Sequence, residues 1–132
     1  MTVPRDHAII VTAAVIEHGG RFLVTRRLEG THLAGFWEFP GGKCEGTETA
    51  KQCLARELRE ELDVEVSVGE EIFRTYYDYP ERRLDLRFFR CALNGSPRPV
   101  QGQEMRWVGR VELGSLPFPP ADTAFIAQLT NP

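Results

Sequence analysis

The sequence predicts a single domain of the α/β class, more specifically α+β, in which strands and helices pack in layers around one core. The chain has 132 residues, the length of one ordinary domain, and 42% of them are hydrophobic, which is enough to form a core. Segments with strand patterns precede, separate and follow two segments with helical patterns. Because no linker or repeat divides the chain, we expect one domain over residues 1–132.

The first part of the chain is expected to form a β-hairpin. Residues 7–16 are rich in β-branched side chains, which predicts a buried strand. Residues 17–20 end in two glycines and predict a turn, and the alternation over residues 21–26 predicts the second strand. A loop over residues 29–35 and a short aromatic segment over residues 36–39 follow.

A helix is expected from about residue 48 to residue 62. Thr47 is a suitable N-cap because its hydroxyl can accept a hydrogen bond from the first turn. Leu54, Leu58 and Leu62 fall at positions i, i+4 and i+8, so they form one apolar stripe that packs on the core.

The second half of the chain contains further strands and a closing helix. Two prolines before Ala121 introduce a helix over about residues 123–129, and Asp122 is a candidate for its N-cap. A loop is expected over residues 97–103. Strands are expected at residues 64–68, 72–79, 84–93 and 106–108.

The charge and cysteine content exclude several classes of protein. The chain carries 16 basic and 19 acidic residues, a net charge of -3, so we expect no binding to a nucleic-acid polymer. No apolar run reaches the roughly 18 residues of a membrane span. The cysteines Cys44, Cys53 and Cys91 are odd in number and form no CxxC pair, which predicts reduced thiols and no disulfide framework or zinc site. Since the start lacks an apolar signal segment, we expect a cytoplasmic location.

Three glutamates on the expected helix form the strongest functional signal. Glu57, Glu60 and Glu61 are spaced i, i+3 and i+4, so they lie within an arc of about 100° beside the leucine stripe. Like charges at this spacing destabilise a helix and oppose each other's ionisation, and a divalent cation removes both effects. Carboxylate oxygens suit Mg²⁺ or Mn²⁺. The alternative is a solvated acidic face neutralised by Arg56 and Arg59.

A Pro-Gly-Gly turn precedes this helix. Gly41 and Gly42 follow Pro40, and two glycines let the backbone approach a ligand closely. A carbonyl at this turn can complete a metal site. An ordinary turn from strand to helix is the alternative.

The glycine turn and the glutamates stand at the intervals of a known motif. Gly42 is followed after five residues by Glu48, and after seven more by Arg56-Glu57-Leu58 and then Glu60-Glu61. This pattern resembles the Nudix box. Its flanks resemble the MutT branch of nucleotide pyrophosphohydrolases at residues 25–27, 37–43, 78–83 and 118–122. The resemblance implies a Nudix α/β/α sandwich around a mixed β-sheet.

The resemblance also implies roles for individual residues. The metal ligands would be the Gly42 carbonyl and the carboxylates of Glu57, Glu60 and Glu61. The other catalytic groups would be Arg56, which orients the glutamates, and Glu48, which braces the loop or assists the metal shell. The substrate-binding residues would be Arg27 and His32 on phosphate, Glu38 near the site, Phe39, Tyr79 and Arg82 around the base, and Asp122 at the base edge. A surface arginine, a solvated histidine, core aromatic residues and a helix cap remain plainer interpretations of Arg27, His32, Phe39, Tyr79 and Asp122.

The chain departs from the family pattern at two positions. Asp63 stands where the box has glycine, at a place that commonly requires a left-handed backbone, which aspartate tolerates better than most residues. Gln101 stands where relatives often have a glutamate, and a neutral amide is a weak metal ligand and no useful base. Glu104 is the nearest carboxylate that could substitute for it.

These features predict a Mg²⁺-dependent hydrolase, with Mn²⁺ as an alternative, that converts a nucleoside triphosphate into a monophosphate and pyrophosphate. Water would attack the β-phosphorus, with Glu57 or Glu60 as the base. The expected substrate is 8-oxo-dGTP, as in nucleotide-pool sanitisation and DNA repair. An ionised Asp122 only accepts hydrogen bonds and favours CTP or 5-methyl-dCTP as the alternative. A catalytically silent nucleotide sensor and a Nudix hydrolase of nucleotide sugars, ADP-ribose or RNA caps are further alternatives. A monomer and a homodimer are both compatible with the sequence.

Overall fold

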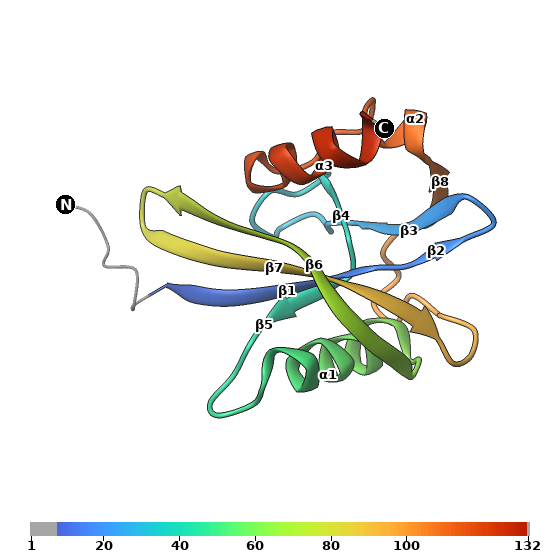
Figure 1. The fold of residues 1–132 in the computed structure, drawn as a ribbon, viewed down its shortest axis with the longest axis horizontal. Coiled ribbons are helices and arrows are strands. Elements are labelled where there is room, and N and C mark those ends of the chain that lie inside the picture. The colour runs from blue at the N-terminus through green and yellow to red at the C-terminus, as the bar shows by residue number, and fades with distance from the viewer. Residues whose placement is uncertain (1–7, 132) are drawn as a thin grey trace.

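The computed structural model describes residues 8–131 and has three layers (Figure 1). Helix α1 (Ala50–Leu62) covers one side of the β-layer. Helices α2 (Arg110–Leu113) and α3 (Thr123–Thr130) cover the other side. The predicted α/β/α sandwich is therefore confirmed. His7, where the first strand was expected to begin, lies outside the described residues.

The first sheet is mixed. Its strand order is β5 (Gly41–Lys43), β1 (Ile9–Val15), β7 (Arg82–Leu93) and β6 (Val66–Tyr79). Strand β1 is parallel to β7, whereas the β5–β1 and β6–β7 pairs are antiparallel. The strands expected separately at residues 64–68 and 72–79 form one continuous strand, because β6 pairs with β7 on both sides of an irregularity between Val68 and Phe73.

The second sheet is built around β3 (Arg21–Arg26). This strand pairs with β2 (Glu17–His18) and β8 (Met105–Gly109), and its end pairs with β4 (Trp37–Glu38). The expected hairpin is therefore wrong in its extent, because β1 belongs to the first sheet and β3 pairs with β2 instead. The turn is confined to Gly19 and Gly20, whose φ angles of 59° and 78° favour glycine.

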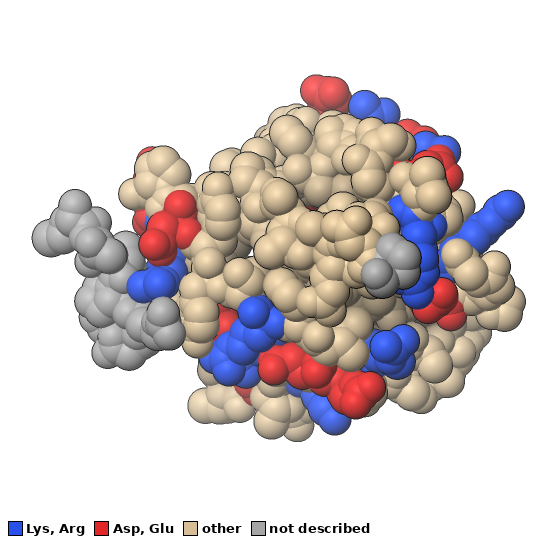
Figure 2. Space-filling model, turned by 45° about the horizontal axis from the view of Figure 1, so that its top comes forward, with Lys and Arg blue, Asp and Glu red and all other residues tan. Residues whose placement is uncertain are grey.

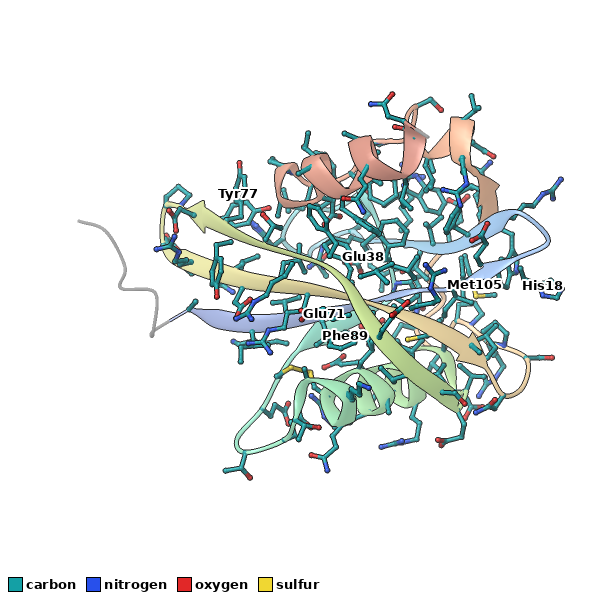
Figure 3. All side chains as sticks on the ribbon, in the orientation of Figure 1. His18, Glu38, Glu71, Tyr77, Phe89 and Met105 are labelled. Carbon is teal, nitrogen blue, oxygen red and sulfur yellow. A yellow bond between two sulfur atoms is a disulfide. The ribbon has the colours of Figure 1, made fainter. Side chains whose placement is uncertain are left out.

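An apolar cluster lies on each side of the sheets. Because neighbouring side chains on a strand point to opposite faces, β7 contributes to both clusters. Phe88 packs on Phe125 of α3, with ring centroids 4.2 Å apart, whereas Phe89 packs on the α1 side (Figure 3). The predicted leucine stripe of α1 is confirmed as fully buried: Leu54, Leu58 and Leu62.

Helix α1 begins two residues later than expected. Thr49, rather than Thr47, is the N-cap, because its hydroxyl accepts a hydrogen bond from Gln52 N while the Gln52 side chain accepts one from Thr49 N. At the other end, Asp63 adopts the predicted left-handed conformation, with φ 49° and ψ 47°, and its N–H donates to the Arg59 carbonyl.

The prediction of reduced cysteines is wrong for two of the three. Cys44 and Cys53 form a disulfide with their Cα atoms 5.2 Å apart, and Cys91 is a buried free thiol. The physical reason is the path of the chain after β5. Cys44 still donates its N–H to the Ile10 carbonyl at 2.9 Å, and the capped start of α1 brings Cys53 back beside it.

Charged side chains of both signs lie next to one another along the rim of the face in Figure 2, where a broad uncharged area includes α3. Helix α3 carries no acidic or basic residue. Within the described part of the chain, no helix combines the length and the hydropathy needed to cross a bilayer.

Candidate active site

A cavity of about 680 Å³ gathers residues that are far apart in the sequence. Its volume lies in the range usual for small-molecule sites. Its walls come from β1, β5, β7, the loop after β3 and the turns beside Tyr79 and Asp122. Of the residues singled out in the sequence, those lining it are Arg27, His32, Glu38, Phe39, Gly42, Glu61, Tyr79, Arg82 and Asp122. The remaining ones are not among its lining residues: Glu48, Arg56, Glu57 and Glu60.

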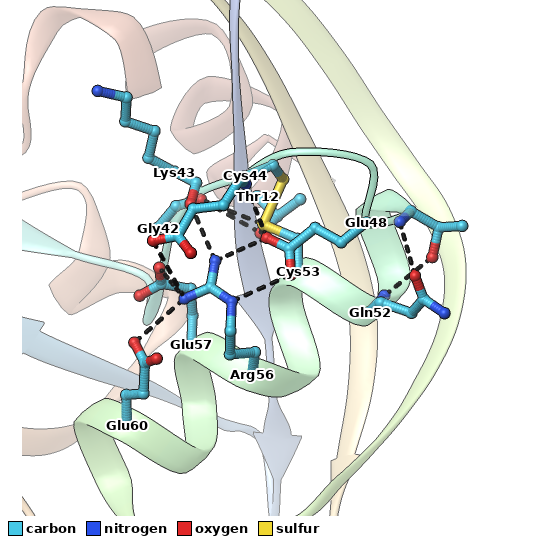
Figure 4. Close-up of a disulfide and its surroundings, with 12 residues drawn as sticks. Thr12, Gly42, Lys43, Cys44, Glu48, Gln52, Cys53, Arg56, Glu57 and Glu60 are labelled. Atoms are coloured by element: carbon cyan, nitrogen blue, oxygen red, sulfur yellow. Dashed lines mark hydrogen bonds and ion pairs between the residues drawn. A yellow bond between two sulfur atoms is a disulfide. The ribbon is translucent and has the colours of Figure 1, made fainter.

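Arg56 is the centre of an ion-pair network on α1 (Figure 4). Its Nε and Nη2 donate to the two carboxylate oxygens of Glu48 at 3.0 and 2.7 Å. Its Nη1 donates to Glu57 at 3.0 Å and to Glu60 at 3.1 Å, and its Nη2 donates to the Lys43 carbonyl at 3.1 Å. The bonds from Arg56 lower the pKa of Glu48 to about 2, so this carboxylate is ionised at neutral pH. One guanidinium thus orients three glutamates and ties the end of β5 to α1.

The Glu57 carboxylate lies against the backbone of Gly42. A Cβ on residue 42 would stand 2.4 Å from Glu57 Cδ and 2.5 Å from its Oε2, so only glycine fits without displacing Glu57. The Glu57 side chain is 14% exposed, and burial raises its pKa against the opposing effect of Arg56. The Thr12 hydroxyl donates to the Gly42 carbonyl at 3.4 Å.

Glu61 lies deeper, close to other acidic groups. Burial raises the pKa of Glu61 to about 8, and the negative charges of Glu38 and Glu57 add to this effect. Burial also raises the pKa of Glu38, although Arg27 opposes the shift through an ion pair of 3.0 Å. Buried carboxylates in excess over nearby cations are the donors that suit a hard divalent cation.

The residues present fit such a cation through Gly42, Glu57 and Glu61. These groups are close to one another, since Glu57 touches Gly42 and is near enough to Glu61 to raise the pKa of that carboxyl. Glu60 lies nearer to solvent than these groups, with its side chain 60% exposed and paired with Arg56. All four donors supply oxygen, which suits Mg²⁺ or Mn²⁺ better than softer metals.

A second cluster of ligand-type side chains does not fit a metal ion in this structure. Among the described residues, Cys44, Glu48 and Cys53 place one ligand atom each within 4.8 Å of one another. The disulfide removes both sulfurs as thiolate ligands, and Glu48 is occupied by Arg56.

The same cavity is lined by the residues expected to meet phosphate and base. Arg27 is held by Glu38 and donates from Nε to the His32 carbonyl, and its side chain stays 30% exposed. The rings of His32 and Tyr79 meet edge to face at a centroid distance of 5.9 Å. Arg82 lines the same cavity from the start of β7.

Asp122 stands at the N-cap position of α3, but its side chain makes no capping hydrogen bond. The expected N-cap position is therefore confirmed, but the side chain does not act as a cap. The residue is 7% exposed, and burial raises the pKa of its carboxyl to about 7, with a contribution from the charge of Glu38. Both protonation states are thus populated near neutral pH. Phe39 also lines the cavity, while packing into the core against Phe118 with ring centroids 5.4 Å apart.

Sequence reasoning missed the apolar part of the cavity wall. Ile9 and Val11 of β1 and Leu84 and Leu86 of β7 line it. The available signal was their spacing of two, which puts all four on the sheet face opposite α1.

Gln101, which stands where relatives often have a glutamate, and Glu104, its possible substitute, both lie outside the cavity lining. Glu104 pairs with Arg26 at 3.4 Å on the surface. Gln101 lies in the loop beside the end of α1, where the Gln103 side chain donates to the Glu61 carbonyl at 3.2 Å.

Comparison with known proteins identifies the family. Residues 11–128 match the NUDIX domain. The chain belongs to the Nudix family. It is 38% identical to an 8-oxo-dGTP diphosphatase of Haemophilus influenzae, over 96% of this chain and 95% of that protein. It is 36% identical to a CTP pyrophosphohydrolase of Escherichia coli, over 86% of this chain and 85% of that protein.

The Nudix fold is equally clear. The solution structure of the E. coli ORF135 protein matches with a TM-score of 0.80 and 35% sequence identity, and the match covers 96% of this chain and 91% of that one. The family and the fold class expected from the sequence are thus confirmed. The two activities that the sequence left open both occur among the names of these relatives.

Proposed function

We propose that this Nudix protein is a magnesium-dependent hydrolase that converts a nucleoside triphosphate and water into a nucleoside monophosphate and pyrophosphate. One observation carries this proposal. The cavity that is lined by Gly42 and Glu61 is also lined by Arg27 and Asp122, so a single site offers oxygen donors for a cation, a guanidinium for phosphate and a carboxyl for a base. This combination suits a nucleotide better than any uncharged metabolite.

In the proposed reaction, the chain positions the triphosphate and moves one proton. Gly42, Glu57, Glu60 and Glu61 would hold Mg²⁺ or Mn²⁺, which when bound lowers the pKa of water and neutralises charge on the phosphoryl oxygens. Glu57 or Glu60 accepts the proton of the water that attacks the β-phosphorus. Arg56 holds both carboxylates in place through its Nη1.

The remaining cavity residues bind the substrate. The Arg27 guanidinium, already placed by Glu38, donates to the phosphate oxygens, and His32 lies next to it. Tyr79, with Phe39 and Arg82, surrounds the base. Arg56 and Glu48 act as positioning residues. Arg56 reaches the reaction only through Glu57 and Glu60, and Glu48 only through Arg56.

We propose 8-oxo-dGTP as the substrate, in nucleotide-pool sanitisation linked to DNA repair. A protonated Asp122 donates to O6 of the oxidised purine, and the raised pKa of this buried carboxyl supports that state. The relative from H. influenzae is named for this activity. CTP or 5-methyl-dCTP is the second candidate, because an ionised Asp122 accepts a hydrogen bond from cytosine N4. The E. coli relative named as a CTP pyrophosphohydrolase supports this candidate.

We propose a single Nudix domain over residues 1–132, acting in the cytoplasm on small nucleotides as a monomer or homodimer, with no nucleic-acid polymer or membrane as partner. A silent nucleotide sensor is the less supported alternative, because all of the proposed acidic ligands are present: Glu57, Glu60 and Glu61.

A pyrophosphate-release assay over 8-oxo-dGTP, dGTP, CTP, 5-methyl-dCTP and ADP-ribose tests the proposal. Each nucleotide is assayed with Mg²⁺, with Mn²⁺ and with a chelator, and coupled inorganic pyrophosphatase distinguishes pyrophosphate from phosphate. Metal-dependent pyrophosphate release from a triphosphate supports the proposal. Release of phosphate alone, or turnover of ADP-ribose alone, contradicts it.

A further inference from the structure

The disulfide lies against the backbone that carries the proposed metal ligands. Cys44 follows Gly42 by two residues, and Cys53 precedes Arg56 by three. The Cys53 Sγ atom lies 3.4 Å from the Thr12 hydroxyl and 3.8 Å from the Gly42 carbonyl oxygen (Figure 4). The sulfur bridge and the glycine turn are therefore in van der Waals contact, and a change in one reaches the other directly.

We propose that Cys44 and Cys53 form a reversible redox site. A peroxide oxidises the two thiols to the disulfide, and a dithiol reduces the disulfide again. In the disulfide state, residues 44–49 keep the conformation that the metal site requires. The effect on metal binding rests on the proposed function, whereas the redox chemistry of the two sulfurs does not. A cytoplasmic disulfide is usually transient, which agrees with reversibility.

The two sulfurs differ in access, and this difference sets the order of events. Cys44 is half-buried, whereas Cys53 is fully buried. A dithiol therefore attacks Cys44 Sγ through its thiolate, the S–S bond breaks, and Cys53 leaves and takes up a proton. The second thiol of the reductant then releases Cys44 as a thiol, and the reductant becomes a disulfide. In the reverse direction, hydrogen peroxide takes two electrons and two protons from the two thiols, which forms the S–S bond and two molecules of water.

Non-covalent contacts keep the two cysteines adjacent after reduction. Glu48 joins the loop to α1 through Arg56 and accepts a hydrogen bond from Glu45 N at 2.8 Å. The Cys44 N–H remains paired with the Ile10 carbonyl on β1. Because these contacts do not involve sulfur, we expect the reduced protein to stay folded and the thiols to close again within one molecule.

Reduction should still loosen the loop. The cysteines are nine residues apart, and loss of a crosslink of that span should lower the melting temperature by about 10 °C. The freed segment begins next to the Gly42 turn and includes Glu48. We therefore expect the Mg²⁺ concentration for half-maximal rate to rise about tenfold, the lower end of the effect seen when groups around metal ligands are altered.

The test compares full-length protein treated with hydrogen peroxide and with dithiothreitol. Iodoacetamide labelling under denaturing conditions, read by mass spectrometry, should give one label after peroxide, at Cys91, and three after dithiothreitol. Melting temperature and Mg²⁺ titration are measured on the same samples. The Cys44→Ser variant should resemble the reduced protein, and neither reagent should change its melting temperature or its Mg²⁺ requirement. The control Cys91→Ala should respond as the wild type does.

The outcomes distinguish the redox chemistry of the two cysteines from its effect on metal binding. Three labels after peroxide would overturn the redox site, whatever the activity. Stoichiometric Zn²⁺ uptake by the reduced protein that prevents reoxidation would replace it with a thiolate metal site at Cys44, Glu48 and Cys53. Complete switching of the disulfide with an unchanged Mg²⁺ requirement would refute the coupling and leave nucleotide hydrolysis intact. If no nucleotide is hydrolysed in either state, the proposed function fails, and the label counts and melting temperatures still decide the redox site.

Discussion

Replacement of Gly42 by alanine tests the contact on which the proposed metal site depends. The added Cβ would lie 2.4 Å from Glu57 Cδ and 2.8 Å from Oε1, whereas ordinary contacts begin at 3.4 Å. The Glu57 carboxylate must therefore retreat by at least about 1 Å, and a misplacement of that size can reduce turnover about 100-fold. The displaced atoms are the end of a flexible side chain, so the fold should be retained, with a melting temperature within about 3 °C of the wild type.

The assay measures kcat/KM and the Mg²⁺ concentration for half-maximal rate beside the melting temperature. Gly109→Ala is the matched control, because its Cβ would have no neighbour within 4 Å, and it should keep wild-type activity. Gly41→Ala is the opposite control, since its Cβ would stand 2.0 Å from the Thr12 carbonyl oxygen and should destabilise the β1–β5 pair. If Gly42→Ala keeps more than half of the wild-type kcat/KM, the contact with Glu57 is not part of the catalytic arrangement.

The remaining predictions concern the cation, the bond cleaved and the base. Glu61→Gln should reduce the Mg²⁺-dependent rate at least 100-fold with an unchanged melting temperature, and a variant that retains most turnover would show that Glu61 is no ligand. Hydrolysis in ¹⁸O water should place the label in pyrophosphate, and label in the monophosphate would contradict attack at the β-phosphorus. The wild-type rate on 8-oxo-dGTP should fall as pH rises through about 7, where Asp122 loses the proton that it donates, while the CTP rate rises. Asp122→Asn should abolish this pH step, raise 8-oxo-dGTP turnover and lower CTP turnover, and no change with either substrate would exclude Asp122 from base recognition. Because the pKa of Asp122 is raised on folding from 3.8 to about 7, its contribution to stability is lost as pH rises between these values, and Asp122→Asn should melt higher than the wild type at pH 8.

Features set by neighbours along the chain were accessible from the sequence. The leucine stripe of α1 depends on a spacing of four residues, and the left-handed Asp63 depends on one backbone position. The start of the same helix was misplaced by two residues because two threonines compete for the cap, and the Gln52 side chain decides in favour of Thr49.

Pairings over longer distances were not accessible in the same way. The hairpin is shorter than the sequence predicts because periodicity identifies a strand but not its sheet, and β1 pairs with β5 and β7. The disulfide was missed because a separation of nine residues does not show that the Cα atoms approach to 5.2 Å.

The sequence by itself determined the family, the order of strands and helices, and the glutamates of the Nudix box, since all of these depend on residue types at fixed local intervals. Only the tertiary structure decided which of those residues share one cavity and in what state. It brings Glu38 to Arg27, buries Asp122 without a capping bond, turns Glu60 toward Arg56 and joins Cys44 to Cys53. Burial and electrostatic coupling depend on groups that are distant in the chain and close in space, so the charge state of Asp122 follows from the packing around it.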